Sequence, residues 1–184
     1  MNETIKEFNY EIYNDRYKYG YNWQIYLNLA KKLIEIMQFS DTRRKKLIDV
    51  GCGMGWFSDI LYFNISKDIK AIDFSNIAVN FHAKRLYPQV DFEVANIYEY
   101  DYKGYEIAIL MEVLEHLEKD IELLSKFDTG TQIFFTVPFE NTRQDCTHVR
   151  EYTHKMIDER FKDILDIKCN VRYENFIIVR GIKK

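Results

Sequence analysis

Short apolar runs alternate with amphipathic segments along most of the chain. The runs with the length and composition of buried strands are 46–50, 69–74, 90–96, 105–113 and 131–138. Apolar residues with the spacing of one helix face predict helices over 23–38, 56–63, 76–87, the segment from Leu117 to Phe127, and 154–164, the last capped by Thr153. Because strands and helices alternate, the pattern predicts a parallel sheet with helices on both faces.

The last part of the chain breaks this alternation. "ILDIKCNVR" (164–172) and "NFIIVRGIK" (175–183) indicate two strands separated by only a few residues, which favours an antiparallel hairpin. The expected fold class is therefore α/β, a Rossmann-like three-layer sandwich. Its seven-stranded sheet is mostly parallel and carries an antiparallel strand from the C-terminal hairpin. In such a sheet ligands bind at the carboxyl ends of the strands, so function is expected there.

Composition and charge narrow the class of protein. Lys and Arg number 26 against 29 Asp and Glu, a net charge of −3, so no global basic excess supports a nucleic-acid partner. The cysteines Cys52, Cys146 and Cys169 form no CxxC pair, which favours reduced thiols. No apolar run approaches the roughly 20 residues that span a bilayer. We expect one domain over 1–184, cytoplasmic and without a membrane segment.

The segment 1–22 is polar and rich in tyrosine, with "YNDRYKYGYNW" starting at Tyr13. Two interpretations stay open for its aromatic cluster. It could form a lid over a ligand site, or it could pack as one edge of the domain.

The stretch "LIDVGCGMGWFS" carries the first candidate chemistry. Gly51, Gly53 and Gly55 follow an expected strand and open an expected helix, where glycines let a ligand lie against the main chain. Asp49 precedes them on the strand, and its carboxylate would repel a pyrophosphate and attract a cation. Asp73 ends the second strand, where a carboxylate accepts hydrogen bonds from ribose hydroxyls. A positively charged adenosine derivative, S-adenosylmethionine, fits both carboxylates.

These residues resemble the motifs of class I S-adenosylmethionine-dependent methyltransferases. "DVGCGMG", "AIDFS", "ANIYEYD" and "EVLEHL" carry the resemblance, which is greatest to the small-molecule type. It implies S-adenosylmethionine as the cofactor and a small-molecule methyl acceptor as the partner. The cofactor-binding residues that it implies are Asp49, Gly51, Cys52, Gly53, Gly55, Asp73, Phe74, Asn96, Ile97, Glu112 and Arg16. Asn96 departs from the family, which more often has Asp there, but its amide oxygen can still accept a hydrogen bond.

Two histidines are candidate general bases. Methyl transfer is an in-line displacement that depends mainly on positioning, and only a weakly acidic acceptor needs a base. His116 follows the fourth expected strand, and His148 lies in "DCTHVREYT". Many small-molecule methyltransferases carry a similar "H-x-R-x-[YF]-T" run beside the substrate pocket, a resemblance that favours His148. A structural role in holding the loop stays open for it.

Three alternatives also stay open. "EVLEH" resembles the enzymes that methylate the 2′-hydroxyl at the 3′ end of small RNAs, which implies a divalent metal held by Glu112, Glu115, His116 and His148. The main hypothesis needs no metal, and "TVPFENTRQD" departs from that RNA family. An NAD-dependent enzyme is disfavoured by G-x-G-x-G and by Asp49. A non-catalytic cofactor-binding protein would keep the fold without turnover.

Overall fold

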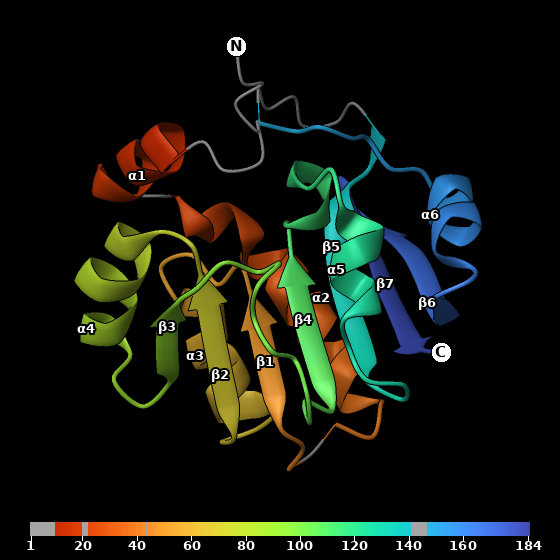
Figure 1. Ribbon diagram of the computed structural model, residues 1–184, viewed down its shortest axis with the longest axis horizontal. Helices are drawn as coiled ribbons and strands as arrows, with labels where there is room; N and C mark the ends of the chain where they lie inside the picture. Colours follow the sequence, from red (N-terminus) through yellow and green to blue (C-terminus); the bar gives the residue numbers. More distant parts are fainter. Residues whose placement is uncertain (1–9, 20–21, 43, 141–146) are drawn as a thin grey trace.

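A seven-stranded sheet forms the centre of the computed structural model, which describes residues 10–19, 22–42, 44–140 and 147–184 (Figure 1). In chain order its strands are β1 Leu47–Val50, β2 Ile69–Asp73, β3 Asp91–Val94, β4 Ile107–Met111, β5 Gln132–Pro138, β6 Leu165–Tyr173 and β7 Phe176–Lys183. They lie in the order β3-β2-β1-β4-β5-β7-β6. Strands β1 to β5 pair in parallel, and β7 runs antiparallel between β5 and β6. The expected fold class is confirmed.

Helices cover both faces of this sheet. The helices and helical turns are α1 Tyr10–Lys18, η2 Trp23–Tyr26, α2 Leu27–Gln38, α3 Trp56–Asn64, η3 Ile77–Ala83, α4 Lys84–Leu86, η4 Leu114–His116, α5 Asp120–Ser125 and α6 His154–Phe161. Leu33 of α2 and Leu61 of α3 belong to one buried apolar cluster, whereas Leu124 of α5 and Phe161 of α6 belong to another. The sheet separates these two clusters, so the molecule has three layers.

The central strands β1, β4 and β5 are apolar because both of their faces are covered. In β1, Leu47 packs into the cluster with α2 and α3, while Ile48 and Val50 pack into the cluster with α5 and α6. All four residues of β1 are buried, as expected for a central parallel strand. This burial explains why the strand has a continuous apolar pattern around Asp49.

The order of the strands reverses at β1, which has β2 on one side and β4 on the other. Such a switch point opens a crevice at the carboxyl ends of the strands. The loop 51–55 after β1, Asp73 at the end of β2 and Glu112 after β4 all lie at this edge. The fold therefore gathers the candidate residues that the chain spreads over more than sixty positions.

Several element boundaries differ from the predictions. The helix predicted over 76–87 is a π-helix over Ile77–Ala83 followed by one α-helical turn. The strand predicted over 105–113 ends at Met111, because Glu112 has a φ of +57° and leaves the extended region. The helix predicted from Leu117 begins at Asp120, after the 3₁₀ turn η4. The helix α1 was not predicted.

The last predicted helix has the expected start. Thr153 accepts a hydrogen bond from the Met156 N–H, which caps α6. Within the described ranges, none of the helices combines the length and the apolar character that crossing a membrane requires.

Candidate functional site

The three glycines of the loop after β1 all have positive φ angles, +77°, +53° and +83° at Gly51, Gly53 and Gly55. Two of them are required by packing. A Cβ at Gly51 would lie 2.6 Å from Val113, and a Cβ at Gly55 would lie 2.6 Å from the Phe92 ring. Only Gly53 faces the crevice side, where a Cβ would lie 3.1 Å from the Tyr17 hydroxyl.

Asp73 joins the end of β2 to this glycine loop. One carboxylate oxygen accepts the Gly53 N–H at 2.9 Å, and the other accepts the Ser75 N–H at 2.8 Å. The side chain is 3% exposed, and this burial raises the pKa of Asp73 to about 6, against the opposing effect of the two N–H donors. Each oxygen keeps a further lone pair, so the carboxylate can still accept hydrogen bonds from a ligand.

Asp49 lies deeper than Asp73. Its carboxylate accepts a hydrogen bond of 2.6 Å from the Ser58 hydroxyl, in the first turns of α3. Burial raises the pKa of Asp49 to about 7, and the nearby charge of Asp73 adds to the shift while the Ser58 bond opposes it. Two buried carboxylates therefore stand behind and beside the glycine loop, and both are easier to protonate than an exposed aspartate.

Of the other expected cofactor residues, Phe74 and Asn96 make specific side-chain contacts, whereas the side chains of Ile97 and Cys52 are buried. Phe74 is half-buried, and its ring meets the Tyr13 ring edge to face at 5.3 Å between centroids. Asn96 holds a turn, because its side-chain oxygen accepts the Tyr98 N–H at 3.0 Å. The side chains of Ile97 and Cys52 are buried in the two apolar clusters, so they can meet a ligand through the main chain only. Burial raises the pKa of the Cys52 thiol well above its usual range.

Glu112 is held between the ends of β4 and β5. Its N–H donates to the Thr136 carbonyl and hydroxyl oxygens, each at 3.1 Å, and the Thr136 hydroxyl donates to the Glu112 carboxylate at 2.9 Å. A non-glycine residue with positive φ at the end of a strand is strained and needs such support. Thr136 thus fixes the Glu112 side chain at the edge of the crevice.

Glu115, His116 and His148 form a compact cluster. One ligating atom from each lies within 4.8 Å of the other two. The two imidazole rings are 4.8 Å apart between centroids, and the His116 Nε2 is 3.6 Å from the Glu115 carboxylate. The His116 Nδ1 lies 3.2 Å from the Thr147 carbonyl oxygen and 3.1 Å from its hydroxyl. Glu112 is not a member of this cluster, so only three of the four residues of the metal hypothesis come together.

Helix α1 lies over the crevice and contacts both of its sides. On the β2 side, Asn14 accepts a hydrogen bond from the Ser75 hydroxyl at 2.9 Å. On the other side, the Tyr13 ring meets the His116 ring at 5.8 Å, and its hydroxyl donates to Thr147 at 3.4 Å. Arg16 is half-buried on the same helix, with its guanidinium carbon 5.5 Å from the Tyr13 ring centre. Figure 1 shows α1 at the edge where the strand arrows of β1, β2 and β4 point.

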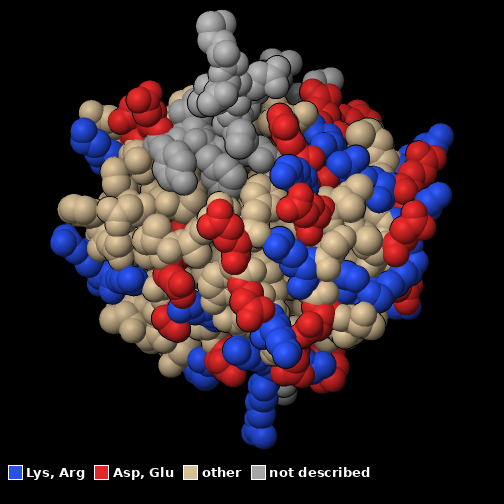
Figure 2. Space-filling view, in the orientation of Figure 1, with Lys and Arg blue, Asp and Glu red and all other residues tan. Residues whose placement is uncertain are grey.

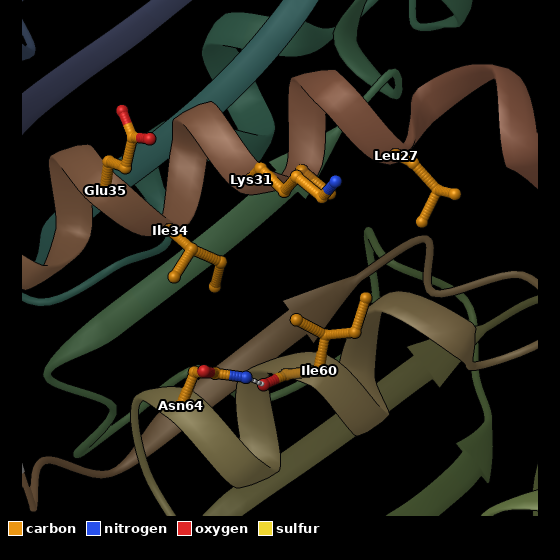
Figure 3. A pocket seen from close by; sticks show the side chains of 7 residues that line it. Leu27, Lys31, Ile34, Glu35, Ile60 and Asn64 are labelled. Carbon is orange, nitrogen blue, oxygen red and sulfur yellow. Dashed lines mark hydrogen bonds between the residues drawn. The ribbon is translucent and has the colours of Figure 1, made fainter.

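A groove of about 410 Å³ lies elsewhere, between α2 and α3 (Figure 3). Leu27, Ile34 and Ile60 give it an apolar wall, and Lys31, Glu35 and Asn64 stand along its rim. It takes no residue from the carboxyl ends of the strands. The groove is therefore separate from the crevice that gathers the candidate residues.

Charge on the surface is mixed. On the face drawn in Figure 2, acidic and basic side chains of the described residues are interspersed. This agrees with the net charge of −3 and offers no extended basic strip on that face.

Sequence reasoning missed the small polar residues that hold the site, Asn14, Ser58, Ser75, Thr136 and Thr147. Only Ser58 had a usable signal, because it follows the glycine turn at the start of an expected helix. The positions of Thr136 and Thr147 depend on which strands become neighbours. The sequence left two roles open for Arg150, pairing with a nearby carboxylate or orienting an anionic substrate, and in the structure it donates to the buried Asp120 carboxylate at 3.0 Å.

A glycine loop after β1, an acidic residue ending β2 and polar side chains after β4 and β5 are the arrangement expected of an adenosine-type ligand site on a Rossmann-like sheet. Residues 22–172 match the family model of the methyltransferase domain, and the chain belongs to this family. The expected class, an S-adenosylmethionine-dependent methyltransferase, and the expected cofactor are thereby confirmed. No curated protein sequence matches the chain.

Solved structures with the same fold include several methyltransferases. The N-methyltransferase NodS from Bradyrhizobium japonicum WM9, in complex with S-adenosyl-L-homocysteine, has a TM-score of 0.76 at 14% identity, over 95% of this chain and 97% of NodS. The Burkholderia thailandensis 1,6-didemethyltoxoflavin-N1-methyltransferase, with its substrate and S-adenosylhomocysteine bound, has a TM-score of 0.77 at 14% identity, over 100% and 92%. Magnesium protoporphyrin IX methyltransferase from Synechocystis PCC 6803 has a TM-score of 0.72 at 18% identity, over 100% of both chains. At these identities the likeness establishes the fold.

Proposed function

We propose that this protein transfers the methyl group of S-adenosylmethionine to an oxygen or nitrogen of a small-molecule acceptor. The observation that carries the proposal is the joining of Asp73 to the Gly53 N–H beside the switch point of the sheet. This contact brings a buried carboxylate and a partly buried main-chain turn together, as an adenosine and its charged sulfonium require. NodS and the toxoflavin methyltransferase, which share the fold, are named for transfer to small molecules or nitrogen atoms.

In this proposal the crevice divides into a cofactor half and an acceptor half. Asp73 accepts the ribose hydroxyls, Phe74 and the 96–97 turn border the adenine, and the 51–55 main chain and Asp49 lie along the methionine part. Arg16 approaches the methionine carboxylate from α1. Glu112, His116 and His148 face the acceptor from the ends of β4 and β5.

The cofactor supplies an activated methyl group, and the protein supplies position and proton transfer. Thr136 holds Glu112 where it can accept a hydrogen bond from the acceptor. Thr147 fixes the His116 ring through Nδ1, which leaves Nε2 toward the cluster. His148 accepts the proton of a hydroxyl acceptor, either alone or by passing it to His116. An amine acceptor that is already neutral needs no base and only has to be aligned with the methyl group. Helix α1, from the described part of the segment 1–22, acts as a lid within a single domain of residues 1–184 and excludes water from the reacting atoms; residues 1–9, 20 and 21 of that segment lie outside the described residues.

Calorimetry tests the cofactor half directly. S-adenosylmethionine and S-adenosylhomocysteine should bind the wild type with micromolar-range affinity, and Asp73→Asn should weaken both at least about 100-fold. Asp91→Asn is the matched control, because Asp91 lies on the next strand, exposed and paired with Lys70. Absence of binding to the wild type would overturn the proposal. Binding without formation of S-adenosylhomocysteine across a panel of hydroxyl and amine acceptors would favour the non-catalytic alternative.

A second candidate is favoured by the geometry of the cluster, namely a methyltransferase assisted by a divalent metal. Glu115, His116 and His148 offer one carboxylate and two imidazoles at mutual distances that a single ion could bridge. The His116 Nδ1 contact to a main-chain carbonyl is the outer-shell arrangement that orients a metal-ligating imidazole. This donor set suits Zn²⁺, Mn²⁺, Co²⁺ or Fe²⁺ better than Mg²⁺. The ion would fix a hydroxyl acceptor and lower its pKa.

Cobalt is a direct probe of this second candidate. Binding of Co²⁺ should give visible absorption bands that His148→Ala and Glu115→Gln remove, while His82→Ala, on η3 outside the cluster, keeps them. If addition of Co²⁺ produces no visible absorption bands, the metal candidate is overturned, and His116 and His148 remain candidate general bases. If Co²⁺ binds, methylation of a small RNA 3′ end in the presence of Mn²⁺ separates an RNA acceptor from a small molecule.

A further inference from the structure

A buried charged network stands next to the histidine cluster. Asp120, at the start of α5, has no exposed surface, and its carboxylate accepts four side-chain hydrogen bonds besides one from the Ile121 N–H. The Arg160 Nε and Nη2 donate at 2.7 and 2.6 Å, and the Arg150 Nη1 and the Tyr152 hydroxyl donate at 3.0 and 2.5 Å. The donors come from α6 and from the segment before it, so one carboxylate joins three parts of the chain.

The segment 147–152 runs alongside the segment 114–120 over its full length. The Val149 and Arg150 N–H groups both donate to the Glu115 carbonyl, at 2.9 and 3.3 Å. The Arg150 guanidinium also donates to the carbonyls of Leu117 and Glu118, at 2.9 and 3.3 Å. The side chains of residues 148, 150 and 152 therefore all meet 114–120: His148 at His116, Arg150 at Leu117 to Asp120, and Tyr152 at Asp120.

The energetics of this network favour one alignment, or register, of the segment 147–152 against the segment 114–120. A carboxylate without exposed surface is costly to leave without a cation, so removing one partner of a buried pair destabilises strongly. If the segment 147–152 shifted by one residue along the segment 114–120, the Arg150 guanidinium would leave the Asp120 carboxylate, which would lose one of its two cations. The hydrogen bonds to Asp120 raise the pKa of Arg160, and burial, with the charge of Asp120 adding to it, raises the pKa of Tyr152, so the Arg160 guanidinium and the Tyr152 phenol keep their protons.

We propose that Asp120 is a positioning residue, which fixes the register of segment 147–152 against segment 114–120 and thereby holds His148 against His116. Asp120 does not touch the ligands, and Arg150 serves this clamp rather than an anionic substrate. The proposal rests on the proposed function only for its catalytic consequence, since the register itself is a property of the protein alone.

The first test measures the register without any ligand. In Asp120→Asn, the amide exchange of Val149 and Arg150 should accelerate at least about tenfold, and the nuclear Overhauser effect between the His116 and His148 rings should disappear. Exchange in β1 and β4 should stay unchanged. Asp91→Asn, which removes one carboxylate of an exposed Lys70 pair, is the matched control and should leave all of these signals as in the wild type.

A second variant keeps the proposal testable if Asp120→Asn does not fold. Arg150→Gln leaves the Arg160–Asp120 pair intact and removes the guanidinium bonds to the segment 114–120 and to the Tyr152 hydroxyl. It should show the same local changes at smaller size, and Arg150→Lys should restore part of the protection. The proposal would be overturned if, in both Arg150→Gln and Asp120→Asn, residues 149 and 150 exchanged their amide protons at the wild-type rate and the contact between the His116 and His148 rings were unchanged.

The catalytic consequence is measured separately. Asp120→Asn should lower kcat at least about tenfold with the KM for S-adenosylmethionine changed less than about twofold, because the cofactor half lies on β1 and β2. A higher KM with unchanged kcat would overturn this consequence. If the wild type binds no cofactor, the proposed function fails, but the exchange and ring-contact results still decide the clamp.

Discussion

At the scale of single residues, the glycines of the loop after β1 have different roles, some in packing and one at the crevice. The sequence pattern assigned all three to ligand approach. The structure divides them, because Gly51 and Gly55 meet Val113 and Phe92, whereas Gly53 alone faces Tyr17 and the crevice. A glycine motif therefore reports the shape of a turn more than the presence of a ligand.

This division predicts that two alanine substitutions affect stability and cofactor binding to different extents. Gly55→Ala should lower the free energy of unfolding by about 2–4 kcal/mol, because a strained left-handed backbone and an overpacked Cβ add together. Gly53→Ala should cost only about 1 kcal/mol of stability but weaken cofactor binding at least about tenfold. Urea unfolding and calorimetry measure the two quantities. Equal loss of stability in both variants would contradict the division.

The two buried carboxylates predict a dependence on pH. Burial raises the pKa of Asp73 to about 6 and of Asp49 to about 7, from about 3.9 in an unfolded chain. Ionisation therefore costs the ligand-free fold stability as pH rises from about 4 to about 7, and the cost is complete above that window. A cationic ligand favours the ionised pair, so S-adenosylmethionine should bind more tightly as pH rises and should release protons near pH 6.5.

Calorimetry near pH 6.5 in two buffers of different ionisation enthalpy measures the released protons. Asp49→Asn should reduce the number released. A binding enthalpy that is the same in both buffers would show that the carboxylates are already ionised in the ligand-free protein.

At the scale of elements, the strands were predictable and the parts that bear on function were less so. Strands covered on both faces must be apolar, and that gave five runs close to the observed strands. Helix α1 lacks such a face, because its residues contact the crevice through Tyr13, Asn14 and Tyr17. Glu112 leaves its strand for a strained conformation that depends on Thr136, a residue 24 positions away. Local patterns cannot report a contact that only the finished sheet creates.

Helix α1 gives a prediction about the lid. Besides its contact with Tyr17 on the same helix, Tyr13→Ala removes two ring contacts across the crevice, to Phe74 and to His116, each worth about 0.5–1.5 kcal/mol. Cofactor should dissociate at least about tenfold faster, measured by stopped-flow fluorescence, with little loss of thermal stability because the helix covers the crevice rather than the core. Tyr19→Ala is the control, since Tyr19 is 79% exposed. Unchanged dissociation in Tyr13→Ala would favour the packed-edge interpretation.

At the scale of the whole molecule, the position of the site followed from the order of elements before any side chain was placed. Alternating strands and helices imply a switch point, and the acidic residues and glycines lie after the strands that flank it. The acceptor half could not be predicted in the same way. Its cluster of Glu115, His116 and His148 depends on two loops, which the buried Asp120 network joins across the fold.

The whole fold should therefore respond to the correct ligand as one unit. At 100 times the dissociation constant, a ligand that binds only the folded state adds about 2.7 kcal/mol of stability. For a chain of this size that raises Tm by about 5–10 °C. S-adenosylmethionine and S-adenosylhomocysteine should both give this shift, and NAD should give none, because its pyrophosphate would lie at the glycine loop and face the Asp49 carboxylate. Trp56, which follows the glycine loop and stacks on Trp23 at 5.3 Å, provides an independent fluorescence signal for the same titration. A shift with NAD of equal size would mean that the crevice selects the adenosine alone, and the two buried carboxylates would then have no part in recognising the sulfonium.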